Sequence, residues 1–348
     1  MATIRDVARV AGVSPTTVSH VLSNRRPVSE ETRKRVLEAV ERVEYVPNAI
    51  AQGLVSQRTN VIGMCFPVTQ LVESNPSLIT LLFTGGRRLR EHGYQLLFVS
   101  TPHEDMKDFR RIARSGLLDG IILYEVLLDD PRVQFMQKHG RIPFVLVGRC
   151  RNTEGISFVD IDSSEGVYQA TTYLIDQGHE RIVFVGGYPR EFSHSFHAHE
   201  GYKRALESRG IAYDPDLVKR TEQSEGAAVG VLEELLRGKV AFSAMICLSE
   251  FVCMTMLKEL RVRGIRVPED VSLISFGNSR SCLMTDPALT AISLCFDEMT
   301  QLAIDILVDK LTDDSPEAKQ ILLTPSLEIR ASSGPCLWEG GRYRVARG

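Results

Sequence analysis

Hydrophobic and polar positions follow two different patterns along the chain, and the change comes near residue 58. Before it, apolar side chains such as Val18, Val21 and Leu22 recur three or four positions apart, which is the spacing of one helix face. Gly12 favours a helix end and Ser14 a new helix start. The pattern predicts three helices, from Thr3 to Gly12, from Ser14 to Leu22 and from Ser29 to about Glu44.

After residue 58, short apolar runs alternate with amphipathic helical stretches in two successive series. Strands that alternate with helices indicate parallel sheets covered on both faces. We therefore predict an all-α helix-turn-helix head followed by an α/β core of two doubly wound lobes, with a ligand cleft where the strand ends face the gap. The predicted strands are Val61–Phe66, Gln95–Val99, Gly120–Tyr124, Phe144–Val147, Arg181–Val185, Ala244–Leu248, Val271–Phe276 and Ala291–Leu294.

The second predicted helix has an outward face without Glu or Lys. Thr16, Thr17, Ser19 and His20 are left on this face once the apolar residues are buried. Small hydroxyls and an imidazole can hydrogen-bond both base edges and phosphates. Thr16 and His20 are four residues apart, so both could reach the floor of one DNA groove. The alternative is a neutral surface helix whose hydroxyls only cap and pack.

A short segment after the third helix has its own apolar face. Asn48 can cap a helix that runs to about Ser56, with Ile50 and Leu54 on one side of it. Such a helix is too short to persist alone and would form only when packed. An apolar wedge in a minor groove is one interpretation, and a plain linker, which Gly53 favours, is the other.

Charge and composition add a modest asymmetry. The 348 residues suggest two or three domains, and the formal net charge is −3. Residues 1–58 carry nine Lys or Arg against six acids, a balance of +3, which leaves −6 for the remainder. A basic head on an acidic body fits a protein whose end alone meets phosphates. The seven cysteines are scattered without CxxC spacing, so we expect buried free thiols.

Membrane and export signals are missing from the sequence. No apolar stretch reaches the ~18 to 20 residues of a spanning helix, and the N-terminus lacks an apolar signal region. We expect a cytoplasmic protein with no membrane partner. A binding protein for transport or chemotaxis would have an export signal and no DNA-binding head, so this alternative fits the chain poorly.

The head resembles the LacI/GalR family of transcriptional regulators, over Thr3–Ala8, Ala11–His20, Val28–Arg33 and Tyr45–Ala51. The resemblance implies that Thr16 and His20 read bases in the major groove, with Pro15 at a third position of this kind. It also implies phosphate contacts and a hinge wedge at the operator centre. The expected DNA-binding residues are Pro15, Thr16, Thr17, Ser19, His20, Arg26, Tyr45 and Leu54. Ser23 departs from the Asn that is common in the family, and Gly53 loosens the hinge.

The resemblance continues through the core and implies a periplasmic-binding-protein-like fold. The matching segments are Phe144–Arg149, Val159–Asp162, Gly178-His179, Gly201-Tyr202, Val267–Ile274 and Asp286–Thr290. The chain should cross between lobes near Asp160, Ala291 and Leu322. We expect a head at 1–46, a hinge helix or linker at 47–58, a core at 59–340 and a tail at 341–348. The N-lobe would take about 59–160 plus 292–321, and the C-lobe about 161–291 plus 322–340.

The expected cleft departs from the pattern of family members that bind sugars or purines. Ala198 stands where they have an Arg, Gly277 where they have an Asp, and Ser249-Glu250 where they have an Asn-Asp pair. The position at which purine-binding members have an aromatic residue that stacks on the ligand falls near Thr221. Arg149 could equally be half of a structural ion pair. The candidate effector-binding residues are Ser77, Arg149, His194, His197, Thr221, Glu250 and Asn278.

Catalytic and metal-binding signatures are lacking. The sequence has no phosphate-cradling Gly-rich loop, no HExxH and no GxSxG. His194, His197 and His199 have a spacing that could supply metal ligands, but no Cys or acid run completes a set. We expect effector-lining or exposed histidines, and neither a metal, a cofactor nor an enzyme activity.

The resulting hypothesis is a sequence-specific DNA-binding regulator, a repressor whose affinity for its operator a small molecule controls. We expect double-stranded DNA with a palindromic operator, a carbohydrate effector and a second copy of the chain as partners. The tail from Ser332 lacks a leucine heptad, which favours a dimer over a tetramer. The alternative is a DNA-binding regulator whose altered cleft responds to a non-sugar or phosphorylated ligand, or to none.

Overall fold

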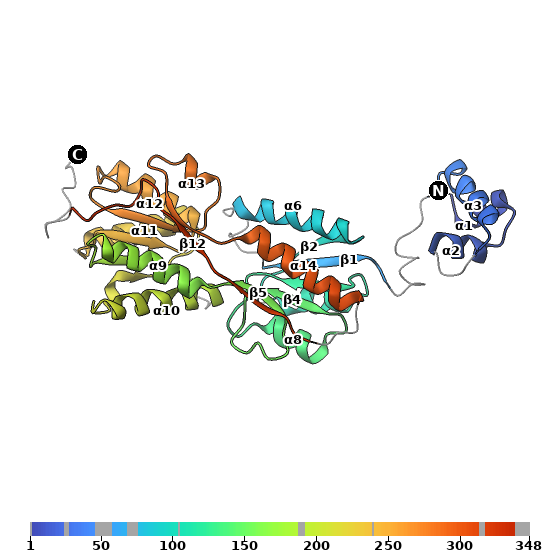
Figure 1. The fold of residues 1–348 in the computed structure, drawn as a ribbon, viewed down its shortest axis with the longest axis horizontal. Helices are drawn as coiled ribbons and strands as arrows, with labels where there is room; N and C mark the ends of the chain where they lie inside the picture. The colour runs from blue at the N-terminus through green and yellow to red at the C-terminus, as the bar shows by residue number, and fades with distance from the viewer. Residues whose placement is uncertain are drawn as a thin grey trace.

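The structure is a computed structural model that describes residues 2–23, 28–45, 58–67, 76–103, 105–186, 192–238, 240–312 and 317–337. A helical head comes first, and two α/β lobes follow along the length of the molecule (Figure 1). The predicted fold class, an all-α head plus a core of two mainly parallel sheets, is confirmed.

The head contains α1 (Ile4–Ala11), α2 (Pro15–Ser23) and α3 (Glu30–Arg42). The carboxylate of Asp6 accepts hydrogen bonds from the backbone N–H and the hydroxyl of Thr3, at 3.0 and 2.7 Å, which fixes the start of α1. Gly12 ends α1 in the left-handed region with φ 67°, a conformation that Gly adopts without a steric penalty. Ser14 then accepts from Thr17 N at 3.0 Å and begins α2.

The three head helices enclose their own small apolar cluster. It consists of Val7, Ala8, Ala11, Val18, Val21, Val36 and Ala39, with Tyr45 packed against it. Val18 and Val21 come from the inward face of α2, as the helical spacing predicts. The outward face of α2 is therefore held in a fixed orientation by the core beneath it.

The N-lobe is built on a six-stranded parallel sheet with the order β11-β5-β4-β3-β1-β2. Its strands are β1 (Val61–Phe66), β2 (Gln95–Ser100), β3 (Gly120–Leu123), β4 (Phe144–Val147), β5 (Phe158–Ile161) and β11 (Gln320–Leu323). Its helices are α6 (Pro76–Glu91), α7 (Met106–Arg114), α8 (Pro131–His139) and α14 (Phe296–Thr312). The inner strands have nearly every residue buried, as in a sheet covered on both faces.

The C-lobe repeats this architecture with the order β12-β10-β9-β8-β6-β7, in which only the β10–β12 pair is antiparallel. Its strands are β6 (Ile182–Val185), β7 (Val218–Lys219), β8 (Ala244–Cys247), β9 (Ser272–Phe276), β10 (Thr290–Ser293) and β12 (Ser326–Glu328). Its helices are α9 (Ser163–Asp176), α10 (Ser193–Ser208), the one-turn η1 (Pro215–Leu217), α11 (Glu225–Arg237), α12 (Glu250–Val262) and α13 (Ser281–Met284).

Three chain segments connect the lobes. The first follows β5, which belongs to the N-lobe sheet, and leads into α9 of the C-lobe. The second follows β10 and leads into α14, and the third joins β11 to β12. One apolar cluster runs through this junction and includes Ile161, Leu294 and Met299. Relative movement of the lobes must therefore bend these three segments.

Helices α9 and α10 approach each other very closely on one face of the C-lobe (Figure 1). Gly201 lies at the contact, where an added Cβ would be 2.1 Å from the carbonyl oxygen of Ser164. Only Gly permits this separation of the two backbones. Because Ser193 and His194 lie at the start of α10, the contact also positions one edge of the space between the lobes.

Candidate DNA-binding face and ligand cleft

The outward face of α2 carries five of the eight candidate DNA-binding residues. Pro15 and Thr16 are exposed, and Thr17, Ser19 and His20 are partly exposed. The hydroxyl of Thr17 lies 2.9 Å from that of Ser14, so the helix cap also orients this side chain. No acidic residue occurs in α2, which leaves the face free of charges that would repel phosphates.

The remaining three candidates lie outside this helix. Tyr45 follows α3, is partly exposed and packs against the apolar cluster of the head. Its backbone N–H donates to Val40 O at 3.0 Å. Arg26 and Leu54 lie outside the described residues, as does most of the segment over which a hinge helix or linker is expected.

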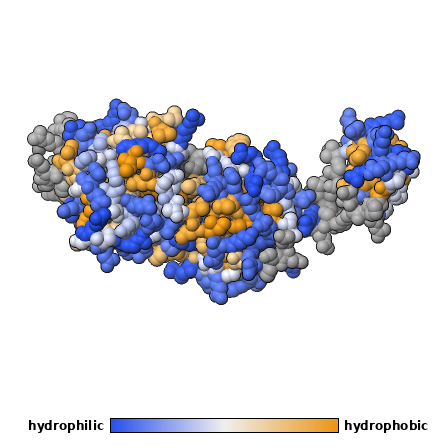
Figure 2. Space-filling model, in the orientation of Figure 1, coloured by the Kyte–Doolittle hydropathy of each residue, from blue (hydrophilic) through white to orange (hydrophobic). Residues whose placement is uncertain are grey.

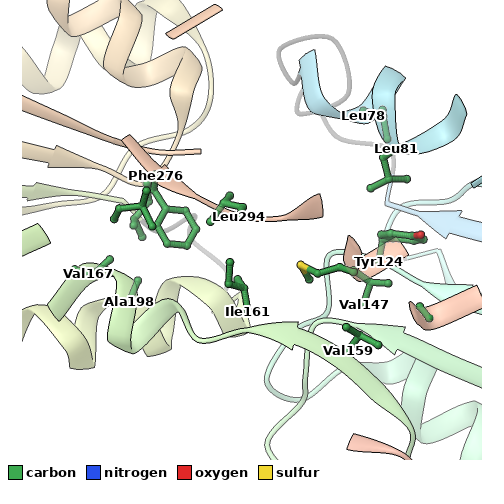
Figure 3. Packing of buried hydrophobic residues seen from close by; sticks show 14 of the residues in the cluster. Leu78, Leu81, Tyr124, Val147, Val159, Ile161, Val167, Ala198, Phe276 and Leu294 are labelled. Atoms are coloured by element: carbon green, nitrogen blue, oxygen red, sulfur yellow. The ribbon is translucent and has the colours of Figure 1, made fainter. Parts of the chain in front are cut away.

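A cavity of about 140 Å³ lies between the two lobes. Leu78, Leu81 and Tyr124 contribute to it from the N-lobe and Phe276 from the C-lobe, with Leu294 on a connecting segment (Figure 3). Its wall is mostly apolar and contains five aromatic residues. These are Phe66, Tyr124, Phe251, Phe276 and Phe296.

The rings of Phe66 and Tyr124 are stacked within this wall, with centroids 4.2 Å apart and planes inclined by 13°. The hydroxyl of Tyr124 is buried and donates to Thr300 Oγ1 at 3.4 Å. The stacked pair presents a rigid aromatic surface to whatever occupies the cavity.

Glu250 is the candidate that lies most directly in the cleft. It occupies the first turn of α12, is 8% exposed and lines the cavity. Its Oε1 accepts a hydrogen bond from Ser279 N at 2.5 Å. Its Oε2 is buried and has no hydrogen-bond partner among the described residues.

Arg149 forms an ion pair instead of lining the cavity. Its Nε lies 3.2 Å from Oδ2 of Asp160, and Asp160 itself is a lining residue that is 4% exposed. Burial raises the pKa of Asp160 to about 6, and the positive charge of Arg149 opposes that rise. Arg149 therefore acts on the cleft through this carboxyl group.

Two histidines of α10 face the same region. His194 lines the cavity, and burial lowers its pKa, which favours the neutral imidazole. Burial, followed by the positive charge of Arg149, lowers the pKa of His197 to about 4. His197 is partly exposed and is not a lining residue, so it lies outside the cavity wall.

The other candidates lie at the margin of the cleft. Thr221 lines a small recess that shares His194 with the main cavity. Asn278 accepts from Arg330 Nη2 at 2.6 Å and is not a lining residue. Ser77 lies in the first turn of α6, and its side chain is not among those described. Ala198 is fully buried in the α9–α10 packing, as its neighbour Val167 is (Figure 3).

Sequence reasoning missed several residues of this site. Asp160 and Ser193 both line the cavity, and the hydroxyl of Ser193 is buried without a partner among the described residues. Asp160 could have been found, because β5 ends in the gap between the lobes and ligands gather at the carboxyl ends of parallel strands. Nothing local in the sequence distinguishes Ser193.

A buried ion pair supports the loop that carries Tyr124 and Glu125 into the cleft. Arg132 and Asp130 are each 1% exposed, and their side chains approach to 2.7 Å. The same guanidinium donates to Tyr124 O at 2.9 Å and to Glu125 O at 3.1 Å. The loop also contacts the C-lobe, because Val126 O accepts from Ser193 N at 3.1 Å.

Within the described ranges, no three His, Cys, Asp or Glu side chains are grouped so as to hold a metal ion. The cysteines among these residues are all free, and five of the seven are buried. No helix in the described part of the chain has the length and apolar character needed to cross a bilayer.

Comparison with known proteins gives matches over both parts of the chain. Residues 3–48 match the family model "Bacterial regulatory proteins, lacI family", and residues 171–333 match the model "Periplasmic binding protein-like domain". The HTH-type transcriptional regulator CelR of Thermobifida fusca is 30% identical over 337 residues, with 95% of this chain and 98% of that protein covered. The HTH-type transcriptional repressor PurR of Aliivibrio salmonicida (strain LFI1238) is 30% identical over 334 residues, with 95% and 99% covered.

The fold has solved counterparts. A transcriptional regulator CelR–cellobiose complex matches with a TM-score of 0.73 and 29% identity, over 95% of this chain and 100% of that one. A helix-turn-helix head joined to a two-lobed binding core defines a class of protein, the DNA-binding transcriptional regulator with a small-molecule sensor. Within this class the chain belongs to the LacI family of bacterial regulators, because full-length relatives share 30% of its residues. These relatives are named as regulators and not as enzymes.

Proposed function

We propose that this regulator is a repressor that reads its operator with the outward face of α2. Thr16 and His20 contact base edges, with Pro15 beside them, and Thr17, Ser19 and Tyr45 contact phosphates. The supporting observation is that α2 buries Val18 and Val21 and turns a face without carboxylates to the outside. Arg26 and the hinge residue Leu54 complete the proposed interface.

The proposed effector is a small molecule bound between the lobes, and a carbohydrate is the class that the relatives favour. The CelR relative has been solved with cellobiose, and this chain has a cavity at the lobe junction. Binding there would favour one relative angle of the lobes. The three connecting segments would transmit this change toward residues 47–58 and so alter the affinity for the operator by a coupling free energy.

The proposed assembly is a homodimer, as a palindromic operator requires. Two exposed apolar pairs support it, on elements that lie along one edge of the core (Figure 1). Ile79 and Phe83 of α6 are 64% and 77% exposed, and Leu283 and Met284 of α13 are 58% and 81% exposed. Apolar residues also gather over the middle of the core, around α14 (Figure 2). Large apolar side chains left this exposed typically mark an interface.

The proposed domains are a DNA-binding head at 1–46, a hinge at 47–58 and a core at 59–340 with a tail after it. The small cluster of the head and the clusters of the lobes support the separation of head from core, because each of these two parts has its own apolar cluster. A cytoplasmic location follows for a protein whose partner is DNA.

The test is binding to a palindromic DNA site obtained by selection from random sequences with the full-length protein. In gel shifts, His20→Ala should weaken binding to the selected site by about 1 to 3 kcal/mol, the typical cost of a lost base contact. Leu54→Ala should also weaken it. Leu37→Ala, an exposed apolar residue of α3 outside the proposed face, is the matched control. Unchanged affinity in both variants refutes the proposed interface.

A further inference from the structure

The carboxylate of Glu250 is buried and only half satisfied. Ser279 N occupies Oε1 at 2.5 Å, whereas Oε2 has no hydrogen-bond partner in the described part of the chain. With 8% of the residue exposed, little water reaches this group. A buried carboxylate oxygen without a donor is costly, so a ligand that supplies a donor or a positive charge gains that free energy on binding.

The backbone around Glu250 leaves room for its carboxylate in the cavity wall. Glu250 lies in the first turn of α12, where the helix dipole stabilises a negative charge. Gly277 lies directly against it, since a Cβ at residue 277 would be 2.8 Å from both Cγ and Oε1 of Glu250. The missing side chain at residue 277 therefore gives the carboxylate its place in the cavity wall.

The charges around the cavity are unbalanced. Its described lining residues include three acids, Glu125, Asp160 and Glu250, and no Lys or Arg. Asp160 is paired with Arg149, whereas His194 has its pKa lowered by burial and so does not supply a positive charge at neutral pH. Glu125 and Glu250 remain, so the described part of the cavity wall attracts a cation and repels phosphate or carboxylate groups.

The rest of the cavity wall suits the uncharged part of a cationic ligand. The stacked rings of Phe66 and Tyr124 are accompanied by Phe276 and Phe296. Aromatic faces accept both the apolar face of a ring and a nearby ammonium group. Ser193 adds a buried hydroxyl with no partner among the described residues, which could bind one further polar group.

We propose that the ligand of this cleft carries a protonated amine on a ring body, with the ammonium donating to Oε2 of Glu250. The proposal rests on the proposed function, because it assigns a chemical feature to the effector. An amino sugar and an aromatic amine share this chemistry. The amino sugar agrees with the carbohydrate class and adds a positive charge to it.

Isothermal titration calorimetry on the full-length protein tests the proposal with two matched pairs of probes. Glucosamine and glucose differ in one ammonium group, and so do 2-phenylethylamine and 2-phenylethanol. The amine of at least one pair should bind about ten- to a hundredfold more tightly than its alcohol, as expected for a hydrogen bond to a buried charge. The pair that discriminates identifies the source of the amine.

Two variants connect the preference to the residue. Glu250→Gln keeps the size of the side chain and removes its charge, so the preference for the amine should disappear. Glu207→Gln removes an exposed carboxylate elsewhere in the C-lobe and should preserve it.

The wild-type comparison needs no variant, so a misfolded Glu250→Gln protein leaves the proposal testable. Lack of saturable amine binding, or equal binding of amine and alcohol in both pairs, overturns it. Operator binding that persists in that case leaves the proposed function intact.

Discussion

Replacing Gly201 by alanine tests how closely α9 and α10 pack. Gly201 is in the interior of α10, and an added Cβ would meet the backbone of Ser164 in α9. The Cβ would lie 2.1 Å from the carbonyl oxygen and 2.8 Å from the carbonyl carbon. Neither atom belongs to a flexible side chain, so the two helices themselves must separate.

The free energy of unfolding should fall as a result. Ordinary contacts of this kind lie near about 3.5 Å, so the helices must move apart by more than roughly 1 Å. Overpacking of a well-packed core costs about 1 to 3 kcal/mol. Alanine recovers up to about 1 kcal/mol through its higher helix propensity. The expected net loss is on the order of 1 to 2 kcal/mol, with the start of α10 displaced at the cleft.

Gly230→Ala is the matched control for this substitution. Gly230 is also inside a helix, α11, but it is exposed and an added Cβ meets nothing within 4 Å. The same substitution should therefore stabilise the protein there by up to about 1 kcal/mol. Urea unfolding followed by circular dichroism measures the free energy of unfolding of both variants. If Gly201→Ala stabilises the protein as much as Gly230→Ala does, the close approach of α9 and α10 is refuted.

Two further predictions concern buried charges of the N-lobe. Asp130→Asn should destabilise the protein by about 3 to 5 kcal/mol, because it leaves Arg132 buried and unpaired. The control Asp129→Asn breaks an exposed pair with Arg151 and should cost less than about 1 kcal/mol. Equal losses of unfolding free energy in the two variants, measured by urea unfolding, would contradict this prediction. The pKa of Asp160 is raised from 3.8 to about 6, so the folded protein binds this proton more tightly than the unfolded chain does. The free energy of unfolding should therefore fall by on the order of 3 kcal/mol as the pH rises from about 4 to about 6. Asp160→Asn should remove that part of the pH dependence, and an unchanged slope in unfolding measurements would show the assignment to be wrong.

The elements of the fold could be predicted from sequence because each depends on a local pattern. The run at Val61–Phe66 becomes β1 with the same bounds, and Gly12 ends one helix while Ser14 begins the next, as their backbone chemistry predicts. The inner strand β5 was not predicted, because Asp160 interrupts its apolar run. The edge strands β7, β11 and β12 were not predicted either. They are short and only half-buried, so the apolar signal that identifies an inner strand is absent from them.

The cleft was less accessible to sequence reasoning because its residues come together only through the tertiary fold. Glu250 and His194 are predicted contacts that do line the cavity, but Arg149 and Asn278 are occupied by Asp160 and Arg330. A sequence indicates that a polar side chain follows a strand, not which neighbour it will meet. The assignment of ligand contacts therefore requires the distances between side chains in the folded structure.

Ala198 and Gly277 look alike in the sequence, as two positions where the cleft has lost a gripping side chain, but they differ in the structure. Ala198 is fully buried between α9 and α10, so its small size belongs to the helix packing that Gly201 also serves. Gly277 lies at the cavity, and its missing Cβ is what admits the carboxylate of Glu250. The carboxylate beside residue 277 is therefore supplied by α12, and substituting Gly277 would displace this acidic group from the cavity wall.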